Sequence, residues 1–362
     1  MMFETIALIL AAIHFSIPLA YYCYAKTEWL PKAWNIKFSN KYRPKVTIIV
    51  PTHNEADIIE KRLENIYRLD YPREKIEVIV VDDASSDRTP DIVEKWTRQH
   101  RDIKVKVIKE PVRGGKLRAV IKALKQVNSE ITVFTDADAF WSSDSLRNAV
   151  KYFADPHVGA VTACMKYAGG TIENCYRSYF NLIRVAESKF HSTPIHNGPF
   201  MAVRTEIIRE IGLPIFPGSD DSCFGSYIAF AGYRAIQADD VIVEEVVRGS
   251  VKRKIRRALR LLINFKKTKN YAKDRKIYVK TSFEKIWKIE QYLHLVNPWI
   301  LIMSILMLLV AALSGSIISL ISVTLGVLLL PIKVYRIWIL QQLYLVLAAI
   351  KNLWTKEVIW SK

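Results

Sequence analysis

Residues 132–140 read TVFTDADAF, a short apolar run that ends in two carboxylates, Asp136 and Asp138, one residue apart. The β-branched and aromatic residues before Thr135 predict a buried strand, and the acids follow where that strand ends. Side chains two residues apart on a strand share a face, so two like charges there repel each other. We therefore expect these acids either to be solvated in a loop or to bind a metal cation.

Strand and helix signals alternate along the chain before this stretch. Strands are predicted at residues 46–50, 78–81, 105–108 and 131–134, and helices at residues 56–69, at residues 115–127 and in a segment that ends near His100. Such alternation implies right-handed crossovers and a mostly parallel central sheet in an α/β domain, which we expect over residues 42–247. Ligands of such sheets bind at the carboxyl ends of the strands.

Four polar segments fall just past these strands or open a helix. They are Pro51-Thr52-His53-Asn54-Glu55, Asp82-Asp83, Gly114-Gly115-Lys116 and Asp136-Ala137-Asp138. Taken singly, each has a structural explanation, since Asn54 suits a helix cap, Asp87 suits a turn and the two glycines suit a flexible loop. Their shared position at strand ends predicts that they converge on one cleft.

Long apolar segments predict a membrane protein. The chain is 51% hydrophobic, and residues 5–25 carry no charge over about the 20 residues that span a bilayer. Glu4 in place of a basic leader favours a retained anchor over a signal peptide. Residues 293–313 and 316–330 predict a helical hairpin, whereas residues 337–350 are shorter and suit an interfacial or re-entrant segment.

Charge predicts the orientation and the partners. The net charge is +18, and residues 248–290 hold 16 Lys plus Arg against three acids. Because this basic segment adjoins an apolar one, we expect it to meet anionic headgroups or a phosphorylated lipid and not nucleic acid. Basic residues beside the spans predict a cytoplasmic catalytic domain at the plasma membrane, and four scattered cysteines without a CxxC pair predict reduced thiols.

Six segments, in this order and spacing, resemble the inverting nucleotide-sugar glycosyltransferases of family 2. They are PTHNEADIIEKRLENI (51–66), VIVVDDASSDRT (78–89), EPVRGGKLRAVIKAL (110–124), FTDADAF (134–140), NGPFMAVRTEIIREIG (197–212) and GSDDSCFGSYIAFAGYRAIQADDVIVEE (218–245). The resemblance covers roughly residues 44–260. With the flanking apolar helices, the chain is similar to the membrane-embedded branch, which includes cellulose, hyaluronan and chitin synthases and polyprenyl-phosphate sugar transferases.

The resemblance implies roles for the donor-site residues. It implies a UDP- or GDP-linked sugar donor and an Mg²⁺ or Mn²⁺ ion that offsets charge on the leaving diphosphate, with Asp138 as metal ligand and Asp136 near the ribose or behind the metal. It places Asp82 or Asp83 at the base and Lys116 near the phosphates, beside the Gly115 turn. The residues expected to line the ribose and base are Pro51, Thr52, Asn54 and Glu55.

The resemblance also implies the catalytic and acceptor residues. An inverting transfer needs one general base, and Asp221, eleven residues before Gly232, occupies that position. Asp220 beside it, together with Arg253 and Arg256, is expected at the diphosphate and acceptor. Processive members carry Trp where this chain has Arg257, which puts a polymer-extending acceptor platform in doubt.

The basic segment also has helical periodicity. Its apolar residues Ile255, Leu259, Leu262 and Ile263 share one face, which predicts an amphipathic helix lying on a membrane. We therefore expect a transmembrane anchor at residues 1–26, the transferase domain at 42–247, basic interfacial helices at 248–290 and apolar C-terminal helices at 291–362.

The leading hypothesis is a membrane-bound hexosyl- or N-acetylhexosaminyltransferase that acts on a polyprenyl phosphate or lipid-linked glycan. One alternative keeps the reaction but extends a polysaccharide processively, and product length separates the two. The other alternative is a membrane scaffold with an inactive transferase domain, which an intact acidic set argues against.

Overall fold

A single mixed sheet forms the centre of the α/β domain. The computed structural model of the chain describes residues 2–167, 172–219, 221–245 and 250–354. Within those residues eight strands lie in the order β3-β2-β1-β4-β7-β6-β8-β5. The strands are β1 (Val46–Thr52), β2 (Ile76–Asp82), β3 (Lys104–Lys109), β4 (Ile131–Phe134), β5 (Ala139–Trp141), β6 (Val158–Tyr167), β7 (Met201–Arg204) and β8 (Arg234–Glu245).

The first four strands pair in parallel, as the alternating pattern predicts. β1 lies between β2 and β4, and β2 pairs with β3. The crossovers are α2 (Ile59–Tyr67), α3 (Thr89–Gln99) and α4 (Lys116–Leu124). α2 begins three residues later than predicted because residues 56–58 form a turn, in which the backbone N–H groups of Ile58 and Ile59 both donate to the Glu55 carbonyl.

The second half of the sheet mixes strand directions. β7 runs antiparallel to both β4 and β6, β8 is parallel to β6, and β5 is antiparallel to β8. The α/β class is therefore confirmed, with the parallel arrangement concentrated in the first half. The helices of this half are α5 (Ser145–Val150), α6 (Ile172–Phe190), α7 (Thr205–Ile211) and α8 (Asp221–Phe230).

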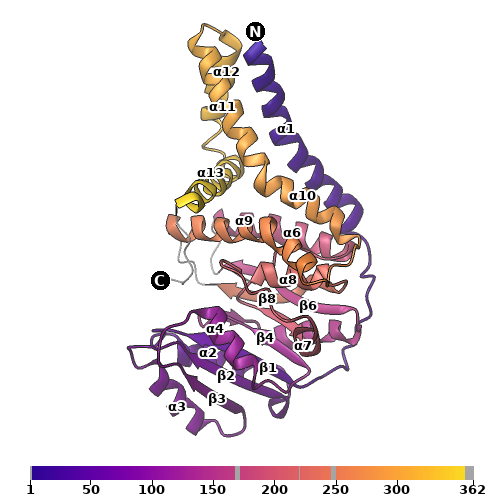
Figure 1. Cartoon of the computed structure of the whole chain (residues 1–362), viewed down its shortest axis with the longest axis vertical. Helices are drawn as coiled ribbons and strands as arrows, with labels where there is room; N and C mark the ends of the chain where they lie inside the picture. Colours follow the sequence, from indigo (N-terminus) through magenta and orange to yellow (C-terminus); the bar gives the residue numbers. More distant parts are fainter. Residues whose placement is uncertain (1, 168–171, 220, 246–249, 355–362) are drawn as a thin grey trace.

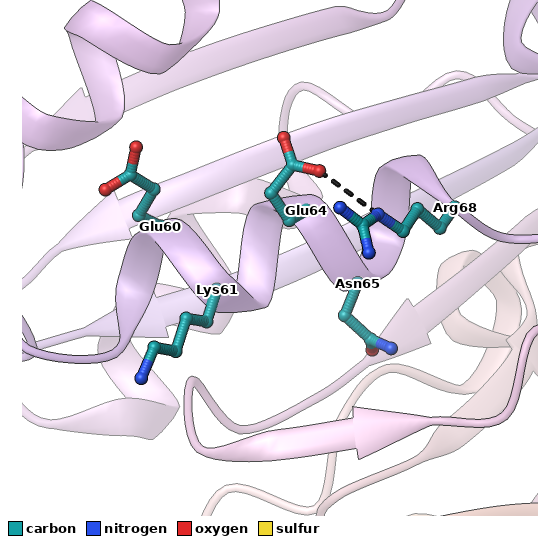
Figure 2. Close-up of a pocket in the computed structure, with 5 residues that line it drawn as sticks. All are labelled: Glu60, Lys61, Glu64, Asn65 and Arg68. Atoms are coloured by element: carbon teal, nitrogen blue, oxygen red, sulfur yellow. Dashed lines mark ion pairs between the residues drawn. The ribbon is translucent and has the colours of Figure 1, made fainter.

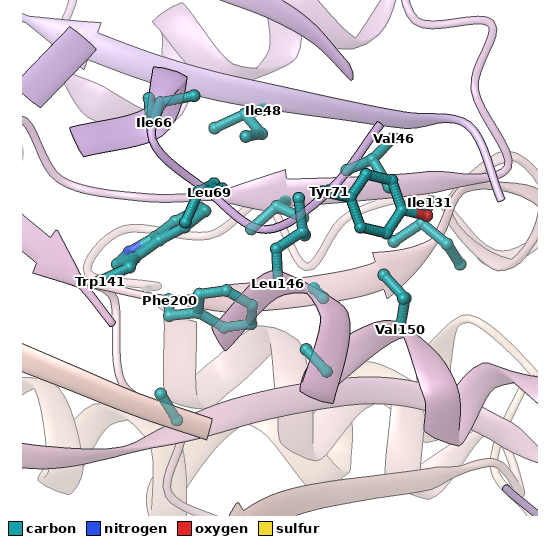
Figure 3. Packing of buried hydrophobic residues seen from close by; sticks show 14 of the residues in the cluster. Val46, Ile48, Ile66, Leu69, Tyr71, Ile131, Trp141, Leu146, Val150 and Phe200 are labelled. Carbon is teal, nitrogen blue, oxygen red and sulfur yellow. The ribbon is translucent and has the colours of Figure 1, made fainter. Parts of the chain in front are cut away.

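Two hydrophobic clusters cover the two faces of the sheet. Alternate residues of β1 separate between them, since Ile48 belongs to one cluster and Ile49 to the other. Figure 3 shows the first cluster, in which Trp141 and Phe200 lie close together with ring centroids 4.6 Å apart. Strand residues that are apolar on both faces are expected where helices cover both sides of a sheet.

Apolar helices project from one end of the domain (Figure 1). Among the residues that the structure describes, three stretches are long and apolar enough to cross a membrane: Phe3–Trp29, Phe283–Leu313 and Lys333–Trp354. They contain α1 (Met2–Tyr24), the consecutive helices α10 (Phe283–Leu295) and α11 (Asn297–Leu313), and α13 (Lys333–Trp354). The predicted second arm of the hairpin, α12 (Ile317–Leu328), has only 12 residues and is short for a full crossing.

The basic helix α9 (Val251–Asp274) differs from expectation in what covers its apolar face. Leu259, Leu262 and Ile263 are buried in one cluster with Tyr344 and Leu345 of α13. In the structure α13 therefore covers this face, and the position of α9 at a membrane surface stays a prediction.

Polar contacts connect the projecting helices to one another. The His14 ring of α1 donates through Nδ1 to the Asn297 carbonyl of α11 (3.0 Å) and accepts from the Trp338 indole of α13 (3.0 Å). Ser304 of α11 donates to the Ala7 carbonyl at 3.0 Å. Such hydrogen bonds specify how the apolar helices pack against one another.

A buried carboxyl group connects α1 to the α/β domain. Tyr21 donates to Glu187 Oε1 of α6 at 2.5 Å, and Thr193 donates to Oε2 at 2.7 Å. Burial, followed by the nearby Glu290 charge, raises the pKa of Glu187 well above its ordinary value. A carboxyl group that keeps its proton in this site avoids the cost of a buried charge.

An aromatic cluster connects α10 to the domain. The fully buried Trp287 ring lies 4.8 Å from that of Phe230 in α8 and 4.9 Å from that of Phe265 in α9. Phe283 completes the cluster one helical turn earlier. α10 therefore packs as part of the domain core, while α11 continues from it away from the domain (Figure 1).

We predict that Trp287→Ala lowers the free energy of unfolding by about 3–5 kcal/mol, because it removes a large buried ring and leaves a cavity. Thermal unfolding of the detergent-solubilised protein measures this, with the backbone signal in far-ultraviolet circular dichroism as the readout. Leu306→Ala is the control, since Leu306 is 53% exposed on α11 and should change the unfolding temperature little. Equal effects of the two substitutions would contradict the packing described.

Candidate active site

The predicted polar segments meet at one edge of the sheet. β1 and β2 run in register to their last residues, where Thr52 is paired with Asp82. β4 lies on the other side of β1, and the Thr135 N–H that follows it donates to the Ile49 carbonyl. The carboxyl ends of β2, β1 and β4 therefore lie side by side, as the rule for parallel sheets requires.

Asp83 holds the glycine loop against this edge. Its carboxylate accepts from the backbone N–H groups of Gly114 (2.7 Å) and Gly115 (2.8 Å). Gly115 has φ +84°, a backbone conformation that side chains with a Cβ rarely adopt. The two bonds fix the start of α4, so that Lys116, its first residue, points to the strand ends.

Asp82 is held differently from its neighbour. It is 3% exposed, and its Oδ2 accepts from the Ser85 N–H at 3.2 Å. Its Oδ1 is buried and has no hydrogen-bond partner among the residues that the structure describes. A buried acceptor of this kind is costly unless a ligand or water supplies a donor. Of the two predicted base-binding acids, Asp82 has the unused oxygen.

The 51–55 segment is tied to the turn after β2. Asn54, in the left-handed region at φ +55°, accepts from the Ser86 N–H through Oδ1 (2.8 Å). The Glu55 N–H donates to Thr89 Oγ1 (2.8 Å). These contacts make Asn54 a link between two loops instead of a helix cap, and they leave Pro51 and Thr52 at the end of β1 beside Asp82.

Lys116 is the centre of the cluster. Its ammonium group lies 2.9 Å from Asp136 Oδ1 and 3.3 Å from Asp221 Oδ2, and only 19% of its side chain is exposed. Burial opposes its charge, but Asp136 and Asp221 together raise the pKa of Lys116 above its usual range. A permanent positive charge therefore joins the acid after β4 to the first residue of α8.

Asp136 lies in a strongly positive environment. Burial would raise the pKa of Asp136, but Lys116, followed by Arg253 and Arg257 of α9, lowers it below the usual value. Arg253 was expected to act with Arg256, which is half-buried on the same helix. In the structure the second arginine that acts on Asp136 is Arg257. It lies four residues after Arg253 and therefore on the same face of α9, which the i, i+4 spacing in the sequence could have indicated.

A loop with its backbone close to Asp221 completes the cluster. A Cβ on Gly198 would lie 2.4 Å from Asp221 Oδ2 and 3.1 Å from Lys116 Nζ. The backbone at Gly198 therefore lies so close to Asp221 and Lys116 that a side chain there would clash with Asp221. Asp221 is 21% exposed by side chain, and Asp220 lies outside the described residues.

The Asp136-Ala137-Asp138 turn suits a hard cation with few protein ligands. Ala137 is buried, which leaves Asp136 and Asp138 half-buried on either side of it. Among the described residues no group of three or more His, Cys, Asp or Glu side chains is arranged to hold a metal. Carboxylate oxygens suit Mg²⁺ and Mn²⁺, which commonly complete their coordination with water and substrate phosphates. The donor set fits an ion that arrives with a phosphorylated ligand.

A shallow hollow on the outer face of α2 has a different character (Figure 2). Glu60, Lys61, Glu64, Asn65 and Arg68 line it, and Arg68 pairs with Glu64 at 3.4 Å. None of these five residues belongs to the predicted site. Asn65 is connected to the turn described above, because its amide exchanges two 2.9 Å hydrogen bonds with the backbone of Trp141.

We predict that Asp83→Ala frees the glycine loop. Each lost hydrogen bond to a charged group is worth about 1.5–3 kcal/mol, so amide exchange at Gly114 and Gly115 should accelerate by about tenfold or more. Hydrogen–deuterium exchange mass spectrometry measures this, with the exposed Asp91→Ala as a matched control. Unchanged exchange in the Asp83 variant would show that the loop does not depend on these bonds.

The solved structures that resemble this chain include a full-length match. The mannosyltransferase PcManGT from Pyrobaculum calidifontis, in complex with GDP-Man and Mn²⁺, superposes with a TM-score of 0.89. The two sequences are 44% identical, and the match covers 98% of this chain and 100% of that chain.

Curated relatives match over shorter stretches. The beta-monoglucosyldiacylglycerol synthase of Synechocystis sp. is 39% identical over 118 residues, which is 33% of this chain and 25% of that protein. A dolichyl N-acetyl-alpha-D-glucosaminyl phosphate 3-beta-D-2,3-diacetamido-2,3-dideoxy-beta-D-glucuronosyltransferase of Methanococcus voltae is 30% identical over 108 residues, or 30% of this chain and 33% of that protein. The chain thus spans a quarter to a third of the length of these relatives.

Family signatures cover most of the chain. The family model described as "Glycosyl transferase family 2" matches residues 47–212, which contain the strand-end segments and the NGPF loop. A second family model, described as "Glycosyl transferase family group 2", matches residues 131–350, more than half of the chain. With the full-length likeness to a mannosyltransferase, the chain belongs to glycosyl transferase family 2.

Proposed function

We propose that this chain is a membrane-associated inverting glycosyltransferase that moves one sugar from a nucleoside-diphosphate donor to a lipid-linked acceptor. The observation that carries the proposal is the Lys116 ammonium group held between Asp136 and Asp221 at the carboxyl ends of β1, β2 and β4. This arrangement puts a fixed cation and two carboxyl groups where sheets of this kind bind nucleotides.

The donor site runs along the strand ends. Asp82, with its unused buried oxygen, accepts from the base, while Pro51, Thr52, Asn54 and Glu55 border the ribose. Asp83 braces the Gly115 loop from behind and does not need to touch the nucleotide.

The diphosphate lies between Lys116 and the basic start of α9. Arg253 and Arg256, with Arg257, supply guanidinium groups that match phosphate oxygens. Asp138 is the proposed ligand of an Mg²⁺ or Mn²⁺ ion, with Asp136 on its other side. When bound, such an ion offsets the negative charge that grows on the leaving diphosphate.

Asp221 is the proposed general base. It accepts the proton of the attacking acceptor group, a sugar hydroxyl or the acidic O–H of a phosphate monoester, as that oxygen bonds to the anomeric carbon, while the bond to the donor phosphate breaks and the diphosphate leaves with the electron pair. The Lys116 ammonium group lies 3.3 Å from Asp221 Oδ2 and so holds this carboxyl group in place beside the donor site. Attack from the face opposite the diphosphate inverts the anomeric configuration.

Both kinds of relative support the choice of substrates. The P. calidifontis enzyme is named a mannosyltransferase in complex with GDP-Man, so GDP-mannose is the first donor to test, ahead of UDP-linked hexoses and N-acetylhexosamines. The names of the shorter matches include a diacylglycerol and a dolichyl phosphate product or substrate. We infer that the acceptor is a polyprenyl phosphate or a lipid-linked glycan.

The membrane arrangement follows from the apolar helices. We propose that residues 1–26 and the α10–α11 stretch anchor the chain, with the domain at residues 42–247 facing the cytoplasm at the plasma membrane. The basic residues 248–290 then lie at the level of the headgroups, although α13 and not lipid covers the apolar face of α9. The remaining helices within 291–362 complete the membrane part. Arg257 in place of a stacking aromatic favours single additions over processive extension.

The function is tested by transfer from GDP-mannose, UDP-glucose and UDP-N-acetylglucosamine to dolichyl phosphate in detergent, with Mn²⁺ or with EDTA. We expect metal-dependent addition of one sugar from one donor class, with inverted configuration by NMR. Retained configuration would overturn the mechanism, and long products would favour a processive synthase. An absence of transfer and of nucleotide binding would favour an inactive scaffold.

We predict that Asp221→Asn lowers kcat by roughly 10²–10⁴-fold, the usual contribution of a general base, because the amide cannot take the acceptor proton. Donor binding should change only a few-fold, since the shape is preserved. Steady-state kinetics with a parallel nucleotide titration separates these effects. Asp91→Asn, on the exposed face of α3, serves as the matched control. A near-normal kcat for Asp221→Asn would remove this residue from the mechanism.

A further inference from the structure

One charged side chain beneath the site takes no part in the roles given above. Arg62, in the middle of α2, is completely buried. Its Nη1 donates to Asn65 Oδ1 at 2.7 Å and its Nη2 to Thr135 Oγ1 at 2.9 Å. The guanidinium carbon lies 4.3 Å from the centre of the Trp141 ring. A buried charge is costly, so its presence here calls for a reason beyond filling the core.

These contacts lie on both sides of the Asp136-Ala137-Asp138 turn. Thr135 comes directly before the Asp136-Ala137-Asp138 segment, and Trp141 comes three residues after it. Both side chains also donate to one carbonyl, that of Pro199, through Thr135 Oγ1 at 2.8 Å and Trp141 Nε1 at 2.9 Å. Pro199 follows Gly198, whose backbone packs against Asp221. The guanidinium thus connects, through two neighbours, the turn that carries the acids and the loop behind Asp221.

The same group places positive charge behind the two acids. Burial lowers the pKa of Arg62 to about 9, and the charges of Asp136 and Asp138 act in the opposite direction. Arg62 therefore stays protonated at neutral pH. Lys116 faces Asp136 from the other side at 2.9 Å, so this acid lies between two cations from different helices.

We propose that Arg62 is a positioning residue that holds the 135–141 turn and the Pro199 carbonyl in the arrangement needed to bind the metal–nucleotide donor. The inference rests on the proposed function, because it concerns the same donor site. Lysine cannot replace the planar group fully, since it lacks the fork that bonds two oxygens while stacking on an indole ring. If Arg62 only filled the core, its replacement would lower the stability of the fold without a specific loss of Mn²⁺ affinity.

The test compares Arg62→Met and Arg62→Lys with Arg204→Met in the full-length protein. Arg204 is the matched control, because it also lies over an aromatic ring, that of Phe153, and donates to backbone carbonyls, that of Phe153 at 2.7 Å. It is paired with Ile131 at the opposite end of β4, away from the site. The readouts are the Mn²⁺ dissociation constant in the presence of GDP, or of UDP if the wild type binds only UDP, measured by electron paramagnetic resonance, and the unfolding temperature.

We expect Arg62→Met to weaken Mn²⁺ binding by about tenfold or more, as loss of groups that orient metal ligands generally does. Arg62→Lys should recover part of this affinity. Arg204→Met should lower the unfolding temperature but leave Mn²⁺ affinity within about twofold of wild type, in line with the independence of distant sites. If Arg62→Met does not fold, a loss of several-fold in Arg62→Lys supports the inference.

Three results would overturn it. Wild-type Mn²⁺ affinity in a folded Arg62 variant would reduce Arg62 to a core residue. Tighter Mn²⁺ binding in Arg62→Met would show that its charge competes with the metal instead of positioning the turn. Absence of Mn²⁺-dependent nucleotide binding in the wild type would overturn the proposed function itself, and this inference with it.

Discussion

The ion pairs of Lys116 are the constraint on which the site depends. One largely buried ammonium group contacts Asp136, at the end of the parallel half of the sheet, and Asp221, at the start of a helix that packs on the mixed half. Neither acid is easily buried alone, and the cation needs both. The pairing thus holds together two parts of the chain that are distant in sequence, and it lowers the pKa of Asp136.

Support for this arrangement comes from backbone and from groups beneath it. Asp83 fixes the loop that delivers Lys116, while Gly198 permits main chain to pass close to Asp221. Arg62 lies on the opposite side of the acids and contacts both sides of their turn. Further out, Trp287 packs α10, the start of the long apolar stretch, into the same domain core.

Much of this could be predicted because the early strands are β-branched runs bounded by polar residues. Residues 46–50 and 131–134 were located within two residues, and the strand-end rule then brought Asp82, Lys116 and Asp136 together. The second half was less accessible, since β6, β7 and β8 pair across long separations that local patterns do not encode. Arg62 was missed although it lies three residues after Ile59 and four before Ile66, on the apolar face of α2. The sequence predicted α13 too short because the charged residues Arg336 and Lys351 bound its apolar run at residues 337–350.

The most direct test of a metal-dependent donor site is calorimetric binding of GDP and UDP to the full-length protein in detergent, with Mn²⁺ and with EDTA, alongside Asp138→Ala. We expect one nucleotide to bind only when Mn²⁺ is present and Asp138→Ala to abolish this binding. Binding that ignores both the metal and Asp138, or binding of neither nucleotide, would contradict it.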